Sequence, residues 1–273
     1  MSAQGNIART LFVGTTVFLV LHTPASQCAT QRDVSPEKVD VELSHLLDNL
    51  HDAKNKTYSD QLAESDAVGK ANDSLRSYLK QRARDPKLLS VPLKSVSDLG
   101  MLIATSPDKK LRLYSWDTQT GGSMRFYSTI AQLHPGNENR CTVIDMSPKE
   151  AGDSEFCKTI SMVRTGEGKN VYLLQTYSVW SSTFRGSTIE AYSIEHGTLK
   201  KFPIFQTTKG SLWEIECSTS DSYDFPDIEL KNNNKSLFVP LIDKNGHQTS
   251  KYLVYKFNGN KYVFQPGAQR SPH

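Results

Sequence analysis

The sequence predicts a mainly β fold, an antiparallel meander with an N-terminal helical cap. Helical periodicity is confined to residues 35–88, and from 92 to 266 short strands alternate with Gly, Asn and Asp turns. The chain has 273 residues, of which 37% are hydrophobic and 22% charged, a composition typical of a globular protein with a sizeable core. We therefore expect a helical cap over 35–88 and one antiparallel β domain over 92–266.

Residues 1–29 have the pattern of a secretory signal peptide. Arg9 precedes an apolar run, residues 11–21, that is too short to span a bilayer, and small residues follow it. The cleavage site stays open between Ala25 and Ala29. We expect a periplasmic or secreted protein with no membrane span in the mature chain. The alternatives are an uncleaved anchor and a lipoprotein anchored at Cys28, although the preceding residues lack the leucine and small side chain of a lipoprotein signal.

Two helices are predicted for the cap. Ser35 and Pro36 suit a helix start, and an apolar stripe then predicts a helix over about 36–53, ended by the polar stretch 54–57. A second stripe predicts a helix over about 60–84, ended by Asp85-Pro86. The stripes comprise Val39, Leu43, Leu46, Leu47 and Leu50, and Val68, Ala71, Leu75, Tyr78 and Leu79. Because this pair is too small to bury a core of its own, we expect it to pack on the β domain.

The segment 101–133 organises the β domain as three strands joined by two turns. Residues 106–110 predict a tight turn, because Pro presets φ and Ser and Asp fold their side chains onto the backbone. Large residues alternate from 111 to 117, which indicates a pleated strand. Gly121 and Gly122 then allow a return strand over about 124–130.

This segment also carries a family resemblance. The string S-x-D-x-K-x-R-x-Y-S-W-D-T-x-T-G-G-S-M, from Ser106 to Met124, resembles the signature of a group of secreted bacterial proteins, most of them uncharacterised. The general likeness covers roughly residues 90–265, and only this string is specific. Lys109 stands where a turn Gly is common, and Ser123 where Thr is common. The resemblance implies export and the fold class, but it implies no reaction.

Further hairpins follow along the chain. A long strand over 171–180 returns over 187–194, and a third group comprises strands at 237–242, 252–257 and 261–264, joined by Asn-Gly turns. The hairpins recur at intervals of about sixty residues. The sequence leaves open whether they form irregular propeller-like blades or a β-sandwich.

Export would place the cysteines in an oxidising compartment, where a disulfide is the default. Cys141 and Cys157 flank a polar excursion, so we predict a bridge that closes a loop of about 15 residues and contributes on the order of 3 kcal/mol. Cys217 is then a buried free thiol or pairs with Cys28. No cation stands beside it in the sequence to favour a catalytic thiolate.

One strand carries the best candidate binding residues. Arg112, Tyr114, Trp116 and Asp117 lie on or beside one strand face, and two aromatic rings flanked by opposite charges suit a sugar or a peptide. The competing interpretation is a buried aromatic face with an Arg–Asp pair between strands.

An acidic stretch is the candidate metal site. Asp221, Asp224 and Asp227 are spaced so that their carboxylates can converge on calcium, although the full calcium-loop pattern is missing. The competing interpretation is a solvated loop, and no other cofactor is expected. Histidine spacings predict no metal site.

The function expected from these observations is binding. The catalytic signatures of hydrolases, metalloproteases and nucleotide-binding enzymes are missing, so no catalytic residue is assigned. The net charge of +3 disfavours a nucleic-acid partner. We expect an envelope interaction protein with a protein or glycan partner, such as an inhibitor or immunity factor. The alternative is a periplasmic, carbohydrate-active hydrolase, which would need two carboxylates facing one cleft, roughly 5 to 10 Å apart.

Overall fold

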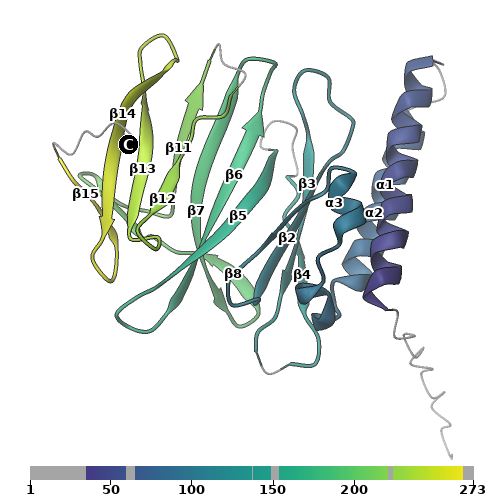
Figure 1. The fold of residues 1–273 in the computed structure, drawn as a ribbon, viewed down its shortest axis with the longest axis horizontal. Coiled ribbons are helices and arrows are strands. Elements are labelled where there is room, and N and C mark those ends of the chain that lie inside the picture. Colours follow the sequence, from purple (N-terminus) through teal and green to yellow (C-terminus); the bar gives the residue numbers. More distant parts are fainter. Residues whose placement is uncertain (1–34, 60–64, 137, 149–153, 221–223, 267–273) are drawn as a thin grey trace, which may run out of the picture. The chain divides into compact units, whose positions relative to one another are not determined.

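The computed structural model confirms the mainly β fold with helices at its N-terminal end (Figure 1). It describes residues 35–59, 65–136, 138–148, 154–220 and 224–266. The predicted signal peptide, including Cys28, lies outside these residues. Among the helices described, none combines the length and the apolar character needed to cross a membrane.

Two long helices, α1 (Pro36–Ser59) and α2 (Ser65–Arg82), form the cap. At the start of α1 the Ser35 hydroxyl accepts the backbone N–H of Lys38 at 3.4 Å, as expected of a capping residue. Both predicted apolar stripes lie in one buried cluster. The predicted end of the first helix near Lys54 is wrong, because α1 continues beyond it. Lys and Asn each cost a helix only a few tenths of a kcal/mol, so the polar stretch 54–57 does not end the helix.

Two short helical segments connect the cap to the sheets. Asp85 caps the 3₁₀ helix η1 (Pro86–Ser90), in which proline takes the first position. The next segment, α3 (Lys94–Asp98), is held by α1, since the Asp40 carboxylate accepts two backbone N–H groups of its first turn at 3.0 and 3.1 Å. Capping hydrogen bonds therefore fix the course of the chain from the cap into the first sheet.

The first sheet is antiparallel, in the order β1 (Leu102–Thr105), β2 (Leu111–Asp117), β3 (Tyr127–Leu133) and β4 (Thr142–Asp145). In the predicted turn before β2, the Ser106 hydroxyl accepts two backbone N–H groups at 3.2 and 3.0 Å, and Lys109 takes a φ of 56°. In the second turn, a Cβ at Gly121 would lie 2.1 Å from the carbonyl oxygen of Met124. The second turn thus requires glycine because the backbone returns so closely.

The second sheet has the order β11-β7-β6-β5, and β8 pairs with the C-terminal part of β7, beyond the part that pairs with β11. Its strands are β5 (Glu155–Arg164), β6 (Asn170–Val179), β7 (Arg185–Glu195), β8 (Thr198–Lys201) and β11 (Glu214–Thr219). The long hairpin predicted from the sequence is the β6–β7 pair, in which Tyr177 lies opposite Ser187.

The third sheet has the order β10-β9-β15-β14-β13-β12. Its strands are β9 (Phe205–Thr207), β10 (Gly210–Leu212), β12 (Glu229–Lys231), β13 (Ser236–Ile242), β14 (Gln248–Phe257) and β15 (Tyr262–Phe264). The predicted hairpins β13–β14 and β14–β15 are both present. One pair is parallel, β15 with β9, and this contact between strands far apart in sequence joins β9 and β10 to the rest of the sheet.

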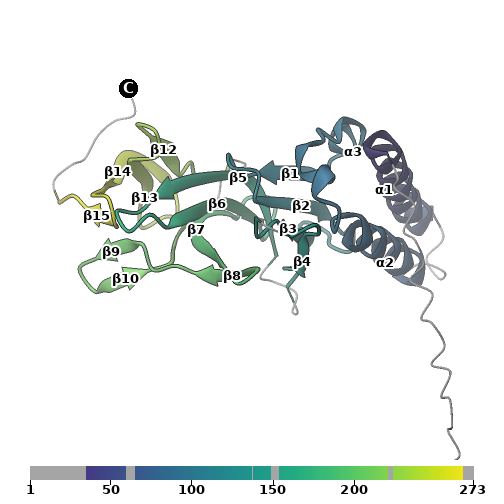
Figure 2. The ribbon, with the colours of Figure 1, turned by 90° about the horizontal axis from the view of Figure 1, so that it is seen from below.

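The layers follow one another in the order cap, first sheet, second sheet, third sheet (Figures 1 and 2). One buried cluster joins the helices to the first sheet through Trp116, a second joins Leu113 to Leu174 of the second sheet, and a third joins Ile189 to Leu237 of the third. Three successive sheets account for the recurrence of hairpins along the sequence. A simple sandwich has only two sheets, so the described residues do not form one.

Candidate functional site

The predicted binding strand lies inside the protein. Arg112, Tyr114 and Trp116 alternate along the face of β2 that packs against the cap, and their exposed fractions are 4%, 0% and 1%. The Tyr114 hydroxyl donates to Oε1 of Gln132 at 2.6 Å, so its polar end is satisfied internally. This face is unavailable to a sugar or a peptide, and the competing interpretation of a buried aromatic face describes its position.

The expected pair between Arg112 and Asp117 is not formed. The Arg112 guanidinium donates to the backbone carbonyl oxygens of Leu88 and of Val91, the latter at 2.6 Å. The Asp117 carboxylate pairs instead with Arg125, with Oδ2 and Nη1 3.1 Å apart. The reason is the pleat: positions 112 and 117 are an odd number of residues apart, so their side chains leave opposite faces of the strand.

The structure describes the acidic stretch only in part, so the predicted calcium site stays a prediction. Asp221 lies outside the described residues, and no group of three or more His, Cys, Asp and Glu side chains that could hold a metal ion occurs among those described. Asp224 and Asp227 are exposed, and the Phe225 ring between them packs edge-on to Tyr177, with centroids 4.9 Å apart. Aromatic packing therefore accounts for the course of this segment.

The predicted disulfide is absent from the structure, in which Cys141, Cys157 and Cys217 are buried free thiols. Cys141 precedes β4 in the first sheet, and its sulfur accepts a hydrogen bond from Gln132 at 3.5 Å. Cys157 lies on β5 in the second sheet, and its sulfur donates to the Thr159 carbonyl at 3.4 Å. The excursion between the first two connects two sheets rather than forming a local loop. Burial raises the pKa of all three thiols, which disfavours thiolate chemistry.

A pocket of about 410 Å³ lies between α2 and the nearby ends of the first sheet, and we call it the α2 pocket. This volume falls within the range of sites for small ligands. Its lining comprises Gly69, Asn72, Asp73, Arg76, Thr118, Thr120, Phe126, Tyr127, Ser128, Ser147, Pro148 and Ser154. Four of these residues come from α2 at helical spacing, so one face of the helix forms a whole wall.

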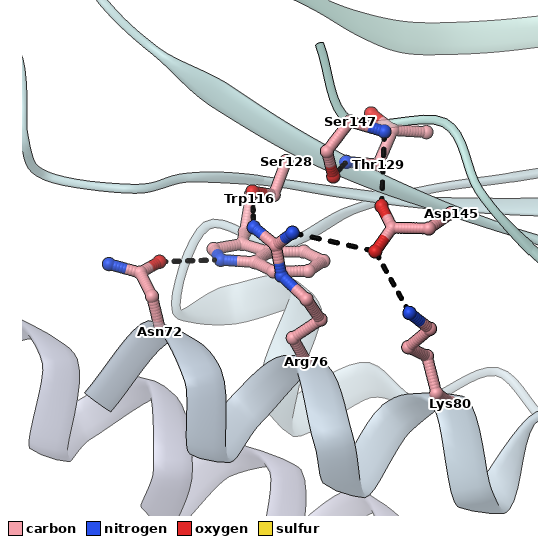
Figure 3. A network of polar contacts seen from close by, with 8 residues as sticks. All are labelled: Asn72, Arg76, Lys80, Trp116, Ser128, Thr129, Asp145 and Ser147. Carbon is pink, nitrogen blue, oxygen red and sulfur yellow. Dashed lines mark hydrogen bonds and ion pairs between the residues drawn. The ribbon is translucent and has the colours of Figure 1, made fainter. Parts of the chain in front are cut away.

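Arg76 anchors a polar network on this wall (Figure 3). Its Nη2 donates to the Ser128 hydroxyl at 2.7 Å, and its Nη1 lies 3.4 Å from Oδ2 of Asp145. Lys80, one turn further along α2, lies 3.0 Å from the same carboxylate oxygen. Both helix cations are thus held against the sheet, and the position of the guanidinium is set before any ligand arrives.

Asp145 is fixed from the sheet side as well. Its Oδ1 accepts the backbone N–H of Ser147 at 3.1 Å, and the Ser147 hydroxyl in turn accepts the N–H of Thr129 at 3.1 Å. Burial acts to raise the pKa of the Asp145 carboxyl, but the hydrogen bonds from Ser147 and Lys80 and the charge of Arg76 outweigh it and lower the pKa. Asp145 is therefore ionised at neutral pH.

Asn72 joins the pocket to the buried face of β2. Its Oδ1 accepts the indole N–H of Trp116 at 3.0 Å (Figure 3). Its Nδ2 donates to the carbonyl oxygens of Val68 and Thr118 at 3.0 and 2.8 Å. The side chain is only 6% exposed. These bonds fix the loop after β2 against α2, so the pocket wall depends on the packing of Trp116.

The sequence carried one signal for this site. Asn72 lies within the apolar stripe of α2, between Val68 and Leu75, and a buried amide in such a stripe needs hydrogen-bond partners. Its partners come from β2 and from the loop after β2, and local periodicity does not identify them. Arg76 and the serines of the sheet gave no comparable signal. The pocket therefore emerged only with the packing of the cap on the sheet.

Comparisons with protein-family models, with curated proteins and with solved structures found no match to this chain.

Proposed function

We propose that the protein acts by binding in the cell envelope, and that the α2 pocket binds a saccharide, as a free sugar or as one unit of a glycan. The observation that carries this proposal is the set of polar groups and aromatic rings that line one pocket of about 410 Å³. The expected export of the chain supports the compartment. The specific string in the first meander, through its resemblance to secreted bacterial proteins, supports it too.

The chemistry of the lining supports a neutral ligand rich in hydroxyl groups. Five serine and threonine hydroxyls line the pocket, namely those of Thr118, Thr120, Ser128, Ser147 and Ser154. Each can both donate and accept, as sugar hydroxyls do. The rings of Phe126 and Tyr127 supply the apolar surface against which the C–H face of a sugar packs.

The charges around the pocket balance. The positive charges of Arg76 and Lys80 are balanced by the negative charges of Asp73 and Asp145. This balance disfavours a strongly charged ligand. The Nε–H of Arg76 is buried and has no hydrogen-bond partner among the residues described, so the guanidinium retains a donor. A donor held in place by the Asp145 pair offers a sugar hydroxyl a charge-assisted hydrogen bond.

The described lining favours binding over hydrolysis. It contains one carboxylate, that of Asp73. Most glycoside hydrolases need a second carboxylate on the other side of the scissile bond. Asp117, the carboxylate of the predicted binding strand, is paired with Arg125 and does not belong to the lining.

Gly69 provides a sharp test. A Cβ built there meets no atom within 4 Å, so a side chain can be added without a clash in the helix. We expect Gly69→Phe to fold normally, to fill the pocket and to abolish binding, whereas Gly69→Ala keeps it. The measurement is calorimetric titration of the full chain with a panel of neutral hexoses, N-acetylhexosamines and their short oligosaccharides.

Saturable binding that survives in Gly69→Ala and disappears in Gly69→Phe supports the proposal. Absence of binding to every saccharide of the panel, or equal binding by both variants, contradicts it. Capture from envelope extract with wild type and Gly69→Phe then shows whether the same pocket takes a protein instead.

A further inference from the structure

A second pocket lies where ends of the first and second sheets meet. It has a volume of about 310 Å³ and we call it the basic pocket. The polar side chains of its lining are those of Lys110, His134, Arg164, Lys169, Asn170 and Tyr172. Three of them carry a permanent positive charge, and no Asp or Glu occurs among the described residues of this lining. Such a lining favours a negatively charged ligand.

The basic side chains come from both sheets. Lys110 and His134 lie at neighbouring strand ends of the first sheet, where the His134 backbone N–H donates to the Lys110 carbonyl oxygen at 2.9 Å. In the second sheet, Arg164 at the end of β5 lies opposite Asn170 at the start of β6, and Lys169 belongs to the turn between these strands. The packing of the two sheets therefore brings the cations to one pocket.

Asp108 holds the two sides of the pocket together. Its Oδ1 accepts the backbone N–H of Lys110 at 3.1 Å, in the turn of the first sheet. Its Oδ2 accepts the Tyr172 hydroxyl at 2.8 Å, on β6 of the second sheet. The turn that carries Lys110 is thus tied to β6, and the spacing across the pocket is set before any ligand arrives.

The carboxylates near the pocket leave much of its charge available. Glu195 pairs with Lys169, which also lies 5.1 Å from the centroid of the Phe202 ring. Asp108 and Glu167 stand outside the lining. Lys169 is therefore the only one of the three lining cations with a carboxylate partner among the described residues.

Lys110 and Arg164 keep unused donors. The Lys110 ammonium makes no hydrogen bond or ion pair with the described residues. The Arg164 guanidinium uses its Nε, which donates to the Gly168 carbonyl oxygen at 3.2 Å, and both of its Nη groups stay available. These donors lie on opposite sheets, so a ligand between them is held from two sides.

We propose that the basic pocket binds a phosphate group, carried by a small phosphate monoester or by a lipid headgroup. Lys110 and Arg164 donate charge-assisted hydrogen bonds to it from the two sheets, and Lys169 adds positive charge. The neutral His134 imidazole can donate one more N–H. A tetrahedral group with several free oxygens uses donors from different directions, whereas a planar carboxylate matches the fork of a single guanidinium.

The inference is independent of the saccharide proposal. The basic pocket and the α2 pocket have no lining residue in common. Gly69→Phe, which fills the α2 pocket, should therefore leave phosphate binding unchanged.

Calorimetric titration of the full chain in a chloride buffer tests the inference with inorganic phosphate and with glycerol 3-phosphate, and glycerol is the neutral control. Sedimentation with phosphatidylcholine vesicles, with and without phosphatidic acid, shows whether the phosphate group can belong to a lipid. We expect saturable binding in at least one of these phosphate arms and no binding of glycerol.

Two variants connect the binding to this pocket. Lys110→Gln and Arg164→Gln each remove one charged donor at an exposed position, so both should fold, and each should weaken binding at least about tenfold. Lys38→Gln is the matched control, because it removes the same charge from an exposed position of α1 and should keep the wild-type affinity. Circular dichroism establishes that each variant is folded.

Three results would overturn the inference. The first is the absence of saturable binding of both phosphate probes at millimolar concentration, together with no effect of phosphatidic acid on sedimentation. The second is wild-type affinity in Lys110→Gln or in Arg164→Gln. The third is an equal loss of affinity in Lys38→Gln, which would assign the binding to the overall charge of the protein.

Discussion

Replacement of Trp116 by alanine tests the packing on which the α2 pocket depends. The ring is 1% exposed within the cluster that joins the cap to the first sheet, and its N–H donates to Asn72 at 3.0 Å. Truncation of a buried Trp costs about 3 to 5 kcal/mol. It also leaves the Oδ1 of Asn72 without its donor, so we expect the upper part of that range. This is a large share of the roughly 5 to 15 kcal/mol that stabilises a typical domain.

Two further variants separate the contributions. Trp116→Phe keeps an aromatic ring and removes the N–H. We expect the lost hydrogen bond to cost roughly 1 to 3 kcal/mol of stability, and the lost packing to cost less than in Trp116→Ala. Leu212→Ala is the control, because Leu212 is 47% exposed and its truncation should change stability by less than about 0.5 kcal/mol. Urea denaturation of the three variants and wild type, followed by circular dichroism, measures the free energies of unfolding.

Native tryptophan emission provides the second readout. Removal of a buried Trp116 should subtract a blue-shifted component from the emission of the folded protein. An unchanged urea midpoint in Trp116→Ala, together with loss of a red, solvent-like component, would refute the reasoning, since the ring would then be exposed and available for binding.

Three other changes have defined outcomes. Gly69→Ala should stabilise the protein by about 0.5 to 1 kcal/mol in urea denaturation, because the added methyl meets no atom and alanine favours the helix. The pKa of Asp145 is lowered in the folded state, so the stability that its carboxylate contributes is present above the ordinary pKa of 3.8 and is lost as the pH falls through the lower folded value. Asp145→Asn should therefore be less stable than wild type at pH 7. On acidification to pH 3 it should lose less stability than wild type does. Burial raises the pKa of Glu190 from 4.5 to about 8, so the stability that its protonated form contributes is present below pH 4.5 and is lost as the pH rises to 8. Melts at pH 5 and pH 8 should therefore show a smaller loss of stability in Glu190→Gln than in wild type. A pH dependence in either variant equal to that of wild type contradicts the corresponding assignment.

The sequence by itself determined the elements and their turns. The apolar stripe that contains Leu43 and Leu47 predicted α1, and the alternation around Tyr114 predicted β2, since both patterns reflect which face of one element is buried. The turn around Ser106 was predicted because its side chain bonds to backbone a few residues away. These interactions are local, so periodicity and turn chemistry suffice to identify them.

Only the tertiary structure decided which groups meet. The Arg112–Asp117 pair and the Cys141–Cys157 bridge were expected from proximity in sequence, but the pleat separates the first pair and the second connects different sheets. The α2 pocket joins a helix to strand ends through Arg76, whose partners lie far along the chain. Such contacts depend on how layers pack, and the period of a single element carries no information on the layer that covers it.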